Sequence, residues 1–244
     1  MRAFLLLVIF LYVIGPNPTL QAESQRPYRN IEKRYHVMEA YRTIKSIDYL
    51  PFSYIRDGCF ARALYVGMEL TSKKIPANNQ YIIGKLIPEG ARWGWHVAPV
   101  VHGPNNKPYI IDPAFADKPL TRKKWVSLSN PKKKPELLIA PITNYRKKQA
   151  KIGQQKQIPG YDYHNRITEF TEIPEFRLKD IANACSVAYK YIGEEDLTAR
   201  QIKNKRRKLI SRTKTLIKRL KRIGKIKSND IIRSCKNQVI IAGK

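Results

Sequence analysis

The chain has 244 residues, of which 43% are hydrophobic, so it is long enough for a domain with a well-formed core and is no peptide-sized cationic toxin. Its 47 Lys and Arg residues against 19 Asp and Glu residues give a formal net charge of +28 at pH 7. This excess goes beyond the needs of solubility and predicts an anionic partner, whether nucleic acid, a lipid or polysaccharide surface, or acidic protein.

The N-terminus has the features of a secretory signal peptide. Arg2 precedes an apolar run from 3 to 14, a Gly and two Pro residues then break the pattern, and small Ala22 ends the segment. About a dozen apolar residues are too few for a membrane span, which needs about 20, and no second run of that length follows. We therefore predict a signal peptide over residues 1–22, cleaved before Glu23, and a secreted or periplasmic protein.

Hydrophobic spacing predicts a domain of mixed helices and strands after the signal peptide. We expect a short amphipathic helix over 31–44 and a second helix with Asp57 as its N-cap, which places Cys59 in the first turn. Short β-branched or aromatic runs, bounded by Pro, Gly and Asn, predict three strands of one antiparallel sheet. These strands are expected over 80–86, 96–101 and 108–113.

The second half of the chain has a different character. Residues 118–176 are loop-like, with one more strand possible over 137–142, and a helix is expected over 177–192. Half of the residues from 200 to 227 are Lys or Arg, and Ile and Leu recur among them at helical spacing, which predicts a basic amphipathic helix. The predicted organisation is a domain over 23–176, followed by a basic helical extension over 177–244.

Three cysteines are present: Cys59, Cys185 and Cys235. In an oxidising compartment thiols tend to pair, and an odd number leaves one of them free. Cys185 and Cys235 both lie in the C-terminal region, so the simplest pairing joins them in a disulfide that closes the extension. Cys59 then remains as a free and candidate reactive thiol.

A nucleophilic thiol needs a base that takes its proton and a third group that orients the base. His96 begins one predicted strand and Asp112 ends the next, and the hairpin between them turns over 104–106. A register that keeps both on one face makes them direct or diagonal neighbours, whereas a slip of one residue would separate them. At a helix start, Cys59 would gain from the helix dipole and the free backbone amides, which favour a thiolate.

Three motifs, "DGCFARA", "WGWHVAPVV" and "IIDPAF", together resemble the bacterial protein-glutaminases, secreted enzymes that hydrolyse the side-chain amide of glutamine within proteins. The resemblance covers about residues 52–125. It implies that Cys59 is the nucleophile, His96 the base and acid, and Asp112 the orienting carboxylate. It also implies an α+β fold with a transglutaminase-like or papain-like core, in which the nucleophile at a helix N-terminus packs on an antiparallel sheet.

The chain departs from that family pattern beside the nucleophile and at the C-terminus. Phe60 stands where the family usually has Tyr, and Leu64 stands where a His often follows. The basic helix has no counterpart that we can place. We therefore expect that the contacts next to the thiol and the range of substrates can differ from those of the family.

Four aromatic residues are candidates for the walls of a substrate cleft: Trp93, Trp95, Phe60 and Trp125. Packing is the alternative interpretation for the two tryptophans of "WGW". Residues expected to bind an anionic partner are Lys203, Arg206, Arg207, Lys218 and Arg222, with a solvated helix face as the alternative. No histidine has ligand spacing with Cys59, so neither a metal nor another cofactor is predicted.

The sequence favours a protein-glutamine glutaminase that releases glutamate and ammonia, and leaves two other functions open. A cysteine peptidase or a transglutaminase-like acyltransferase would use the same three residues, because nothing in them determines the acyl donor or the acceptor. A non-enzymatic cationic binding protein would leave the Cys59 thiol incidental.

Overall fold

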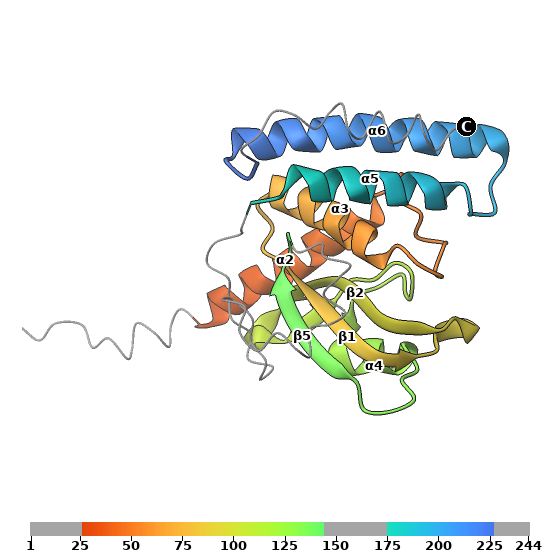
Figure 1. Ribbon diagram of the computed structural model, residues 1–244. Helices are drawn as coiled ribbons and strands as arrows, with labels where there is room; N and C mark the ends of the chain where they lie inside the picture. The colour runs from red at the N-terminus through yellow and green to blue at the C-terminus, as the bar shows by residue number, and fades with distance from the viewer. Residues whose placement is uncertain (1–25, 144–174, 227–244) are drawn as a thin grey trace, which may run out of the picture.

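The computed structural model describes residues 26–143 and 175–226, and the predicted signal peptide lies outside them. The elements keep the labels of Figure 1. The described helices are α2 (Arg26–Lys45), α3 (Cys59–Ser72), α4 (Arg122–Leu128), α5 (Leu178–Ile192) and α6 (Ala199–Arg222). The strands are β1 (Asn78–Leu86), β2 (Trp93–His102), β3 (Pro108–Ile110), β4 (Leu120–Thr121) and β5 (Glu136–Pro141). Short 3-10 turns, η1 (Pro88–Gly90) and η2 (Pro104–Asn106), lie between β1 and β2 and between β2 and β3.

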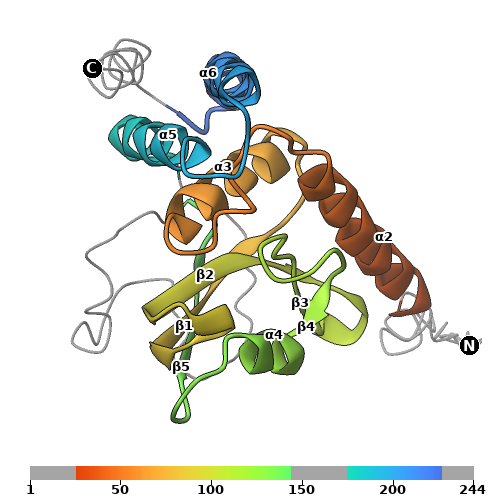
Figure 2. The same cartoon turned by 90° about the vertical axis from the view of Figure 1, so that its right-hand side faces the viewer.

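The described chain forms layers around one antiparallel sheet, whose strand order is β4-β3-β2-β1-β5. Helices α2 and α3 cover one side of the sheet, α5 and α6 lie beyond α3 as an outer layer, and α4 lies on the other side (Figure 1, Figure 2). The prediction of a mixed fold, in which helices pack on an antiparallel sheet, is therefore confirmed.

Alternation along β2 divides the core into two clusters. Val97 belongs to the large cluster between the sheet and the helices, whereas Ala98 and Val100 belong with Trp125 of α4 to the smaller cluster on the other side. His96 lies two residues before Ala98, so its side chain is on the same face of the sheet as those of Ala98 and Val100. The base candidate therefore faces the side of the sheet that α4 covers.

Helix α3 is the central buried element of the molecule. Every residue from 60 to 71 is buried, including the charged Arg62 and Glu69. Gly67 has to be small, because a Cβ atom there would meet Cγ1 of Ile142 at 2.7 Å. The close approach of α3 to the chain that follows β5 holds the start of the helix at a fixed place over the sheet.

The start of α3 differs from the prediction. The N-cap is Gly58, whose φ of 83° lies in the left-handed region, and Asp57 makes no side-chain cap. Asp57 is occupied elsewhere, because its Oδ1 accepts from the amide of Gly58 at 2.6 Å and its Oδ2 from the hydroxyl of Tyr191. The glycine turn makes Cys59 the first residue of the helix.

The three expected strands are present and antiparallel, with shifted ends, whereas β4 and the following α4 lie in a region that was predicted to be loop-like. β1 and β2 begin earlier than expected, and β5 confirms the further strand that was considered over 137–142. β3 ends at Ile110, so Asp112 follows the strand rather than ending it. Backbone amides of Phe115 and Ala116 bond to the carbonyl of Asp112, which closes a turn that contains Pro113 and ends the strand pairing.

Helix α6 is an integral part of this fold. It ends at Arg222, ahead of the predicted end at 227. Gly224, just beyond the observed end, takes a φ of 68°. Leu209, Leu216 and Leu220 are buried in the same cluster as α3 and α5. The same helix also packs against α5, the helix that precedes it in the chain.

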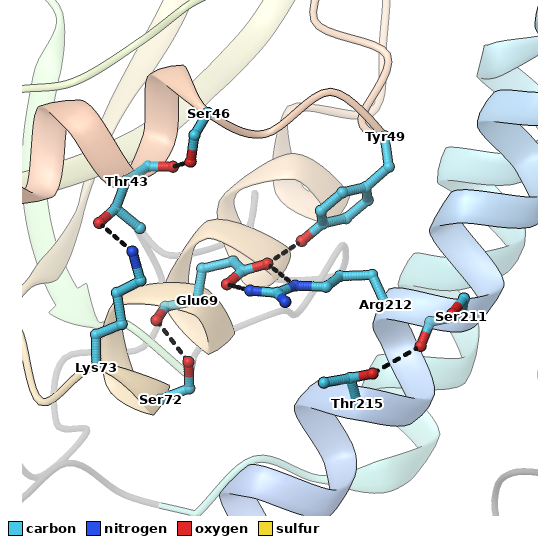
Figure 3. Close-up of polar contacts among 9 residues, drawn as sticks. All are labelled: Thr43, Ser46, Tyr49, Glu69, Ser72, Lys73, Ser211, Arg212 and Thr215. Atoms are coloured by element: carbon cyan, nitrogen blue, oxygen red, sulfur yellow. Dashed lines mark hydrogen bonds and ion pairs between the residues drawn. The ribbon is translucent and has the colours of Figure 1, made fainter.

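A buried polar network joins α6 to α3 (Figure 3). The guanidinium of Arg212 makes two hydrogen bonds to the carboxylate of Glu69, which also accepts from the hydroxyl of Tyr49 at 2.7 Å. A second link joins the hydroxyls of Tyr65 and Thr213 at 2.6 Å. Because these groups satisfy one another, the network fixes the outer layer on the layer beneath.

Among the helices of the described residues, none has the length and apolar composition that crossing a membrane requires.

Candidate active site

Cys59 lies half-buried at the N-terminus of α3, and its thiol is free. Arg62, one turn further along the helix, is buried and braces the loop that leads to the cysteine. Its Nη1 donates to three carbonyl oxygens of that loop: Pro51 (3.3 Å), Tyr54 (2.7 Å) and Asp57 (3.0 Å). Backbone acceptors therefore fix the approach to the thiol.

His96 and Asp112 are brought together by the register of β2 and β3. Val100 pairs with Ile110, so continuing this register sets Asp112 opposite Ala98 and next to His96 on the same face. Nε2 of His96 and Oδ2 of Asp112 are 2.7 Å apart, and both side chains are buried. The proximity predicted from the hairpin is confirmed as geometry.

The other ring nitrogen of His96, Nδ1, is buried and has no hydrogen-bond partner among the described residues. Cys59 and His96 line the same pocket, and Cys59 is among the groups that raise the pKa of His96. The imidazole therefore stands between carboxylate and thiol, which is the arrangement that proton transfer from a thiol requires.

Burial by itself would lower the pKa of His96, because it penalises the imidazolium. The neighbouring carboxylate of Asp112 outweighs this effect and, together with Cys59, raises the pKa of His96 to about 9. Burial likewise opposes ionisation of Asp112, but its charge interaction with His96 and the hydrogen bonds it accepts hold the pKa of Asp112 below its ordinary value. The pair is thus an imidazolium and a carboxylate at neutral pH.

Trp125 holds the carboxylate and does not line the cleft, contrary to the prediction. It is fully buried in α4, and its Nε1 donates to Oδ2 of Asp112 at 2.8 Å. Oδ1 of the same carboxylate accepts from the amide of Ala114 at 3.2 Å. The alternation of side chains along β2 explains why Trp125 is not in the cleft. It places His96 and its partners on the face of the sheet that α4 covers.

An aromatic cage surrounds the imidazole. The ring centroids of Trp93, Phe115 and Trp125 lie 4.8, 5.0 and 5.6 Å from that of His96. Trp93 and Phe115 also stack on each other, with an interplanar angle of 12°. Phe115 was not among the predicted site residues, although it ends the "IIDPAF" motif, and its position close behind the Asp-Pro step was the available signal.

A pocket of about 310 Å³ opens beside Cys59 and His96. Three of the four predicted cleft residues line it, namely Trp93, Trp95 and Phe60. Trp95 also packs against Phe60, at 6.0 Å between ring centroids, so both interpretations of the "WGW" motif hold for this side chain. The rest of the lining consists of Ile55, Arg56, Asp57, Arg92 and Gly94.

Tyr191, at the end of α5, supports the pocket from outside the catalytic motifs. Its hydroxyl donates to Asp57 at 2.6 Å, and its ring stacks on Tyr54 with centroids 4.6 Å apart. A Cβ atom on Gly58 would meet this ring at 2.7 Å. Nothing local in the sequence marks Tyr191, because the contact joins segments that are far apart in the chain.

The C-terminal predictions divide into described and undescribed parts. Cys185 is disulfide-bonded and buried in α5, whereas Cys235 lies outside the described residues, so the pairing of the two stays a prediction. Of the five cations selected on α6, four are exposed: Lys203, Arg207, Lys218 and Arg222.

Arg206 departs from that set, because its side chain is used within the molecule. Its Nε donates to the carbonyl of Tyr189 at 3.1 Å, and its guanidinium lies 4.2 Å from the centroid of the Tyr189 ring. We therefore remove Arg206 from the residues available to a partner. Within the described ranges, no cluster of His, Cys, Asp and Glu side chains could hold a metal ion.

Comparison with known proteins finds a family model that is similar to the segment around this site. Residues 31–129 match a family model described as Glutaminase. The matched segment, which is less than half of the chain, contains Cys59, His96 and Asp112 and is similar to this family. No significant match was found among curated proteins.

Solved structures of protein-glutaminases are also similar to the chain. A crystal structure of protein-glutaminase has 19% identity over 64% of this chain and 85% of that chain, with a TM-score of 0.45. The NMR structure of protein-glutaminase from Chryseobacterium proteolyticum has 19% identity over 61% of this chain and 82% of that chain, with a TM-score of 0.41. A crystal structure of a mutant of pro-protein-glutaminase has 24% identity over 38% of this chain and 40% of that chain, with a TM-score of 0.35.

Proposed function

We propose that the protein is a protein-glutamine glutaminase that converts glutamine side chains of proteins to glutamate and ammonia. The observation that carries the proposal is the buried pair of His96 and Asp112, 2.7 Å apart, beside a free thiol at the head of a helix. The family match of the surrounding segment supports the same reaction class.

In the first half of the reaction, the sulfur of Cys59 attacks the carboxamide carbon of the substrate glutamine. Attack by the thiolate leaves the proton on the imidazolium of His96, and the amide of Cys59 is one of the helix-terminal donors without an acceptor inside the helix, available to the developing oxyanion. His96 then gives its proton to the nitrogen, the carbon–nitrogen bond breaks, and ammonia leaves a thioester on Cys59.

In the second half, water replaces ammonia. Neutral His96 takes a proton from the water, whose oxygen attacks the thioester carbon, and the carbon–sulfur bond breaks to release glutamate. The thiolate and imidazolium pair is thereby restored. Asp112 keeps the imidazole oriented and supports its positive charge throughout, in the role of the third member of a triad.

Two other reactions use the same first step. A cysteine peptidase would attack a backbone amide, and a transglutaminase-like acyltransferase would admit an amine in place of water. The exposed cations of α6 keep the third candidate in view, a cationic binding protein whose thiol is incidental. Rapid alkylation of Cys59 compared with a buried thiol would argue against that third candidate.

We also propose that the enzyme is secreted or periplasmic and that α6 attaches it to an anionic surface, an acidic protein or a polymer. The first proposal rests on the sequence of residues 1–22, and the second on Lys203, Arg207, Lys218 and Arg222, which are exposed on one helix. N-terminal sequencing of the mature protein tests the first, and a protein that retains Met1 would contradict it.

The decisive experiment is intact-protein mass spectrometry of an unfolded, glutamine-rich substrate after incubation with the wild type or with Cys59→Ala. The wild type should give the mass gain of deamidation and an equal amount of ammonia, and Cys59→Ala neither. Backbone cleavage, or amine incorporation when a primary amine is added, would replace the proposal by one of its chemical alternatives.

A further inference from the structure

Two arginines line the pocket of the candidate nucleophile. Arg56 comes from the loop that precedes α3, and Arg92 stands just before β2, so the two reach the pocket from different segments. Both are exposed. Within the described ranges, neither guanidinium has a hydrogen bond or an ion pair.

The other charged groups of this pocket do not neutralise them. Asp57 is the single carboxylate in its lining, and both of its oxygens are engaged, one by the amide of Gly58 and one by the hydroxyl of Tyr191. Burial and this hydrogen bond to Asp57 raise the pKa of Tyr191, so its hydroxyl stays a proton donor. Together with the imidazolium of His96, the arginines give the pocket an excess of positive charge.

Cations that stabilise the fold look different. Arg212 is paired with Glu69, Lys205 with Glu195, and Lys208 with Asp48. Arg56 and Arg92 lack such partners although they stand next to the reacting thiol. Their charge is therefore available to a substrate.

A pocket of about 310 Å³ has room for the glutamine side chain, so the neighbouring residues of a protein substrate must lie across its rim. A carboxylate there can form a charge-assisted and bidentate contact with a guanidinium, whereas a lysine would be repelled. We propose that Arg56 and Arg92 are specificity-determining residues that select glutamines with acidic neighbours in the substrate sequence. This inference rests on the proposed glutaminase function and names its substrate class.

The test uses three blocked peptides that differ only beside the glutamine, where they carry Glu, Ala or Lys. Ammonia release gives kcat and KM for each. For the wild type we expect the Glu peptide to exceed the Lys peptide in kcat/KM by about tenfold, which corresponds to exposed ion pairs of up to about 1 kcal/mol each. The difference should lie mainly in KM and should shrink as ionic strength rises.

In the double variant Arg56→Gln with Arg92→Gln, the ratio of the Glu to the Lys peptide should fall to about one- to twofold if the exposed ion pairs are lost. The matched control is Lys107→Gln with Lys124→Gln, which removes two exposed charges that do not line the pocket and should keep the wild-type ratio. Equal rates of the wild type on all three peptides, or an unchanged ratio in the arginine variant, would overturn the inference. Failure of all peptides to release ammonia would instead count against the proposed function.

Discussion

Asp112 accepts three hydrogen bonds, from His96, Trp125 and the amide of Ala114. A buried carboxylate is stable only when its oxygens are satisfied in this way. Each donor also limits the rotation of the carboxylate, so that one oxygen stays aimed at the imidazole. The position of the Asp112 carboxylate therefore determines how the imidazole of His96 is oriented.

A first prediction at the scale of single residues concerns the pH dependence of activity. The reaction needs the imidazolium of His96, and its pKa is raised to about 9, so kcat/KM should fall as pH rises through about 9. In Asp112→Asn the charge that raises this pKa is lost, and burial lowers it instead. The alkaline fall should therefore move to lower pH, with weaker but measurable turnover. A pH–rate profile checks this, and an identical alkaline limb in the variant would contradict the proposed role of Asp112.

The second concerns Trp125→Phe, which keeps an aromatic ring but removes the donor to Asp112. A hydrogen bond to a charged group contributes about 1.5–3 kcal/mol, so kcat/KM should fall by about tenfold or more. The pKa of Asp112 should rise because a contact that lowers it is gone, and activity should then be lost at a higher pH on the acid side. A pH–rate profile whose acid limb does not move would show that Trp125 only fills space.

At the scale of elements, the start of α3 and the position of α6 are coupled through the layer between them. α3 is buried along nearly its whole length, with the sheet on one side and α5 and α6 on the other. Glu69 near its C-terminus is paired with Arg212, and Asp57 just before its N-terminus is held by Tyr191. Both ends of the nucleophile helix are therefore tied to the C-terminal helices.

Replacing Arg212 should test this tie. In Arg212→Met the carboxylate of Glu69, which is only 2% exposed, loses its cation, and the free energy of unfolding should fall by about 2 kcal/mol. Denaturant unfolding measures the loss. Lys214→Met, an exposed position of the same helix, is the control and should change stability little. Adding Glu69→Gln to Arg212→Met should recover part of the loss, and no recovery would show that burial of charge is not its cause.

Across the whole molecule, the cations that make up the net charge of +28 have different roles. Some cations of α6 are paired within the fold, including Arg212 and Lys205, while Lys203 and Lys218 are exposed. The helix is 24 residues long, so its exposed face can extend over about 36 Å. A stripe of this length suits an extended anionic partner better than a small ion.

Removal of that charge should separate attachment from chemistry. The variant carries Gln at Lys203, Arg207, Lys218 and Arg222, and we expect weaker retention on heparin, DNA or anionic vesicles at low salt. Wild-type retention should weaken as the Debye length falls from about 10 Å at 0.1 M to about 3 Å at 1 M salt. A control with Gln at four other exposed lysines, Lys123, Lys124, Lys132 and Lys133, keeps the net charge equal. Equal retention of both variants would leave the charge of α6 as a solvated face.

The predicted disulfide belongs to the same scale, because it closes a loop that contains all of α6. Non-reducing peptide mapping should find Cys185 joined to Cys235, and Cys59 alkylated. Reduction should lower the free energy of unfolding by about 2–4 kcal/mol. A bridge that contains Cys59 would remove both the pairing and the proposed nucleophile.

Local patterns in the sequence predicted most of the helices and strands and the candidate residues of the site, but not β4 or α4. Periodicities of two and of 3.6 residues identify strands and helices locally, and a free cysteine, a strand histidine and an Asp-Pro step are visible as letters in order. The antiparallel hairpin was also predictable, but its register was left open, and the observed pairing of Val100 with Ile110 is what places His96 beside Asp112. The ends of elements were less accurate, as at β3 and α6, because tertiary contacts and turns decide where a strand or helix stops.

The tertiary structure alone decided what surrounds these residues. Trp125 was expected in the cleft but bonds to Asp112, because the parity of β2 turns His96 toward the side that α4 covers. Arg206 was expected to be free, but its guanidinium stacks on Tyr189. Tyr191 donates a hydrogen bond to Asp57, which is far from it in the sequence. Such contacts join segments that are far apart in sequence, and their strength depends on burial and orientation. No local pattern encodes either quantity, because both arise only when the layers pack together.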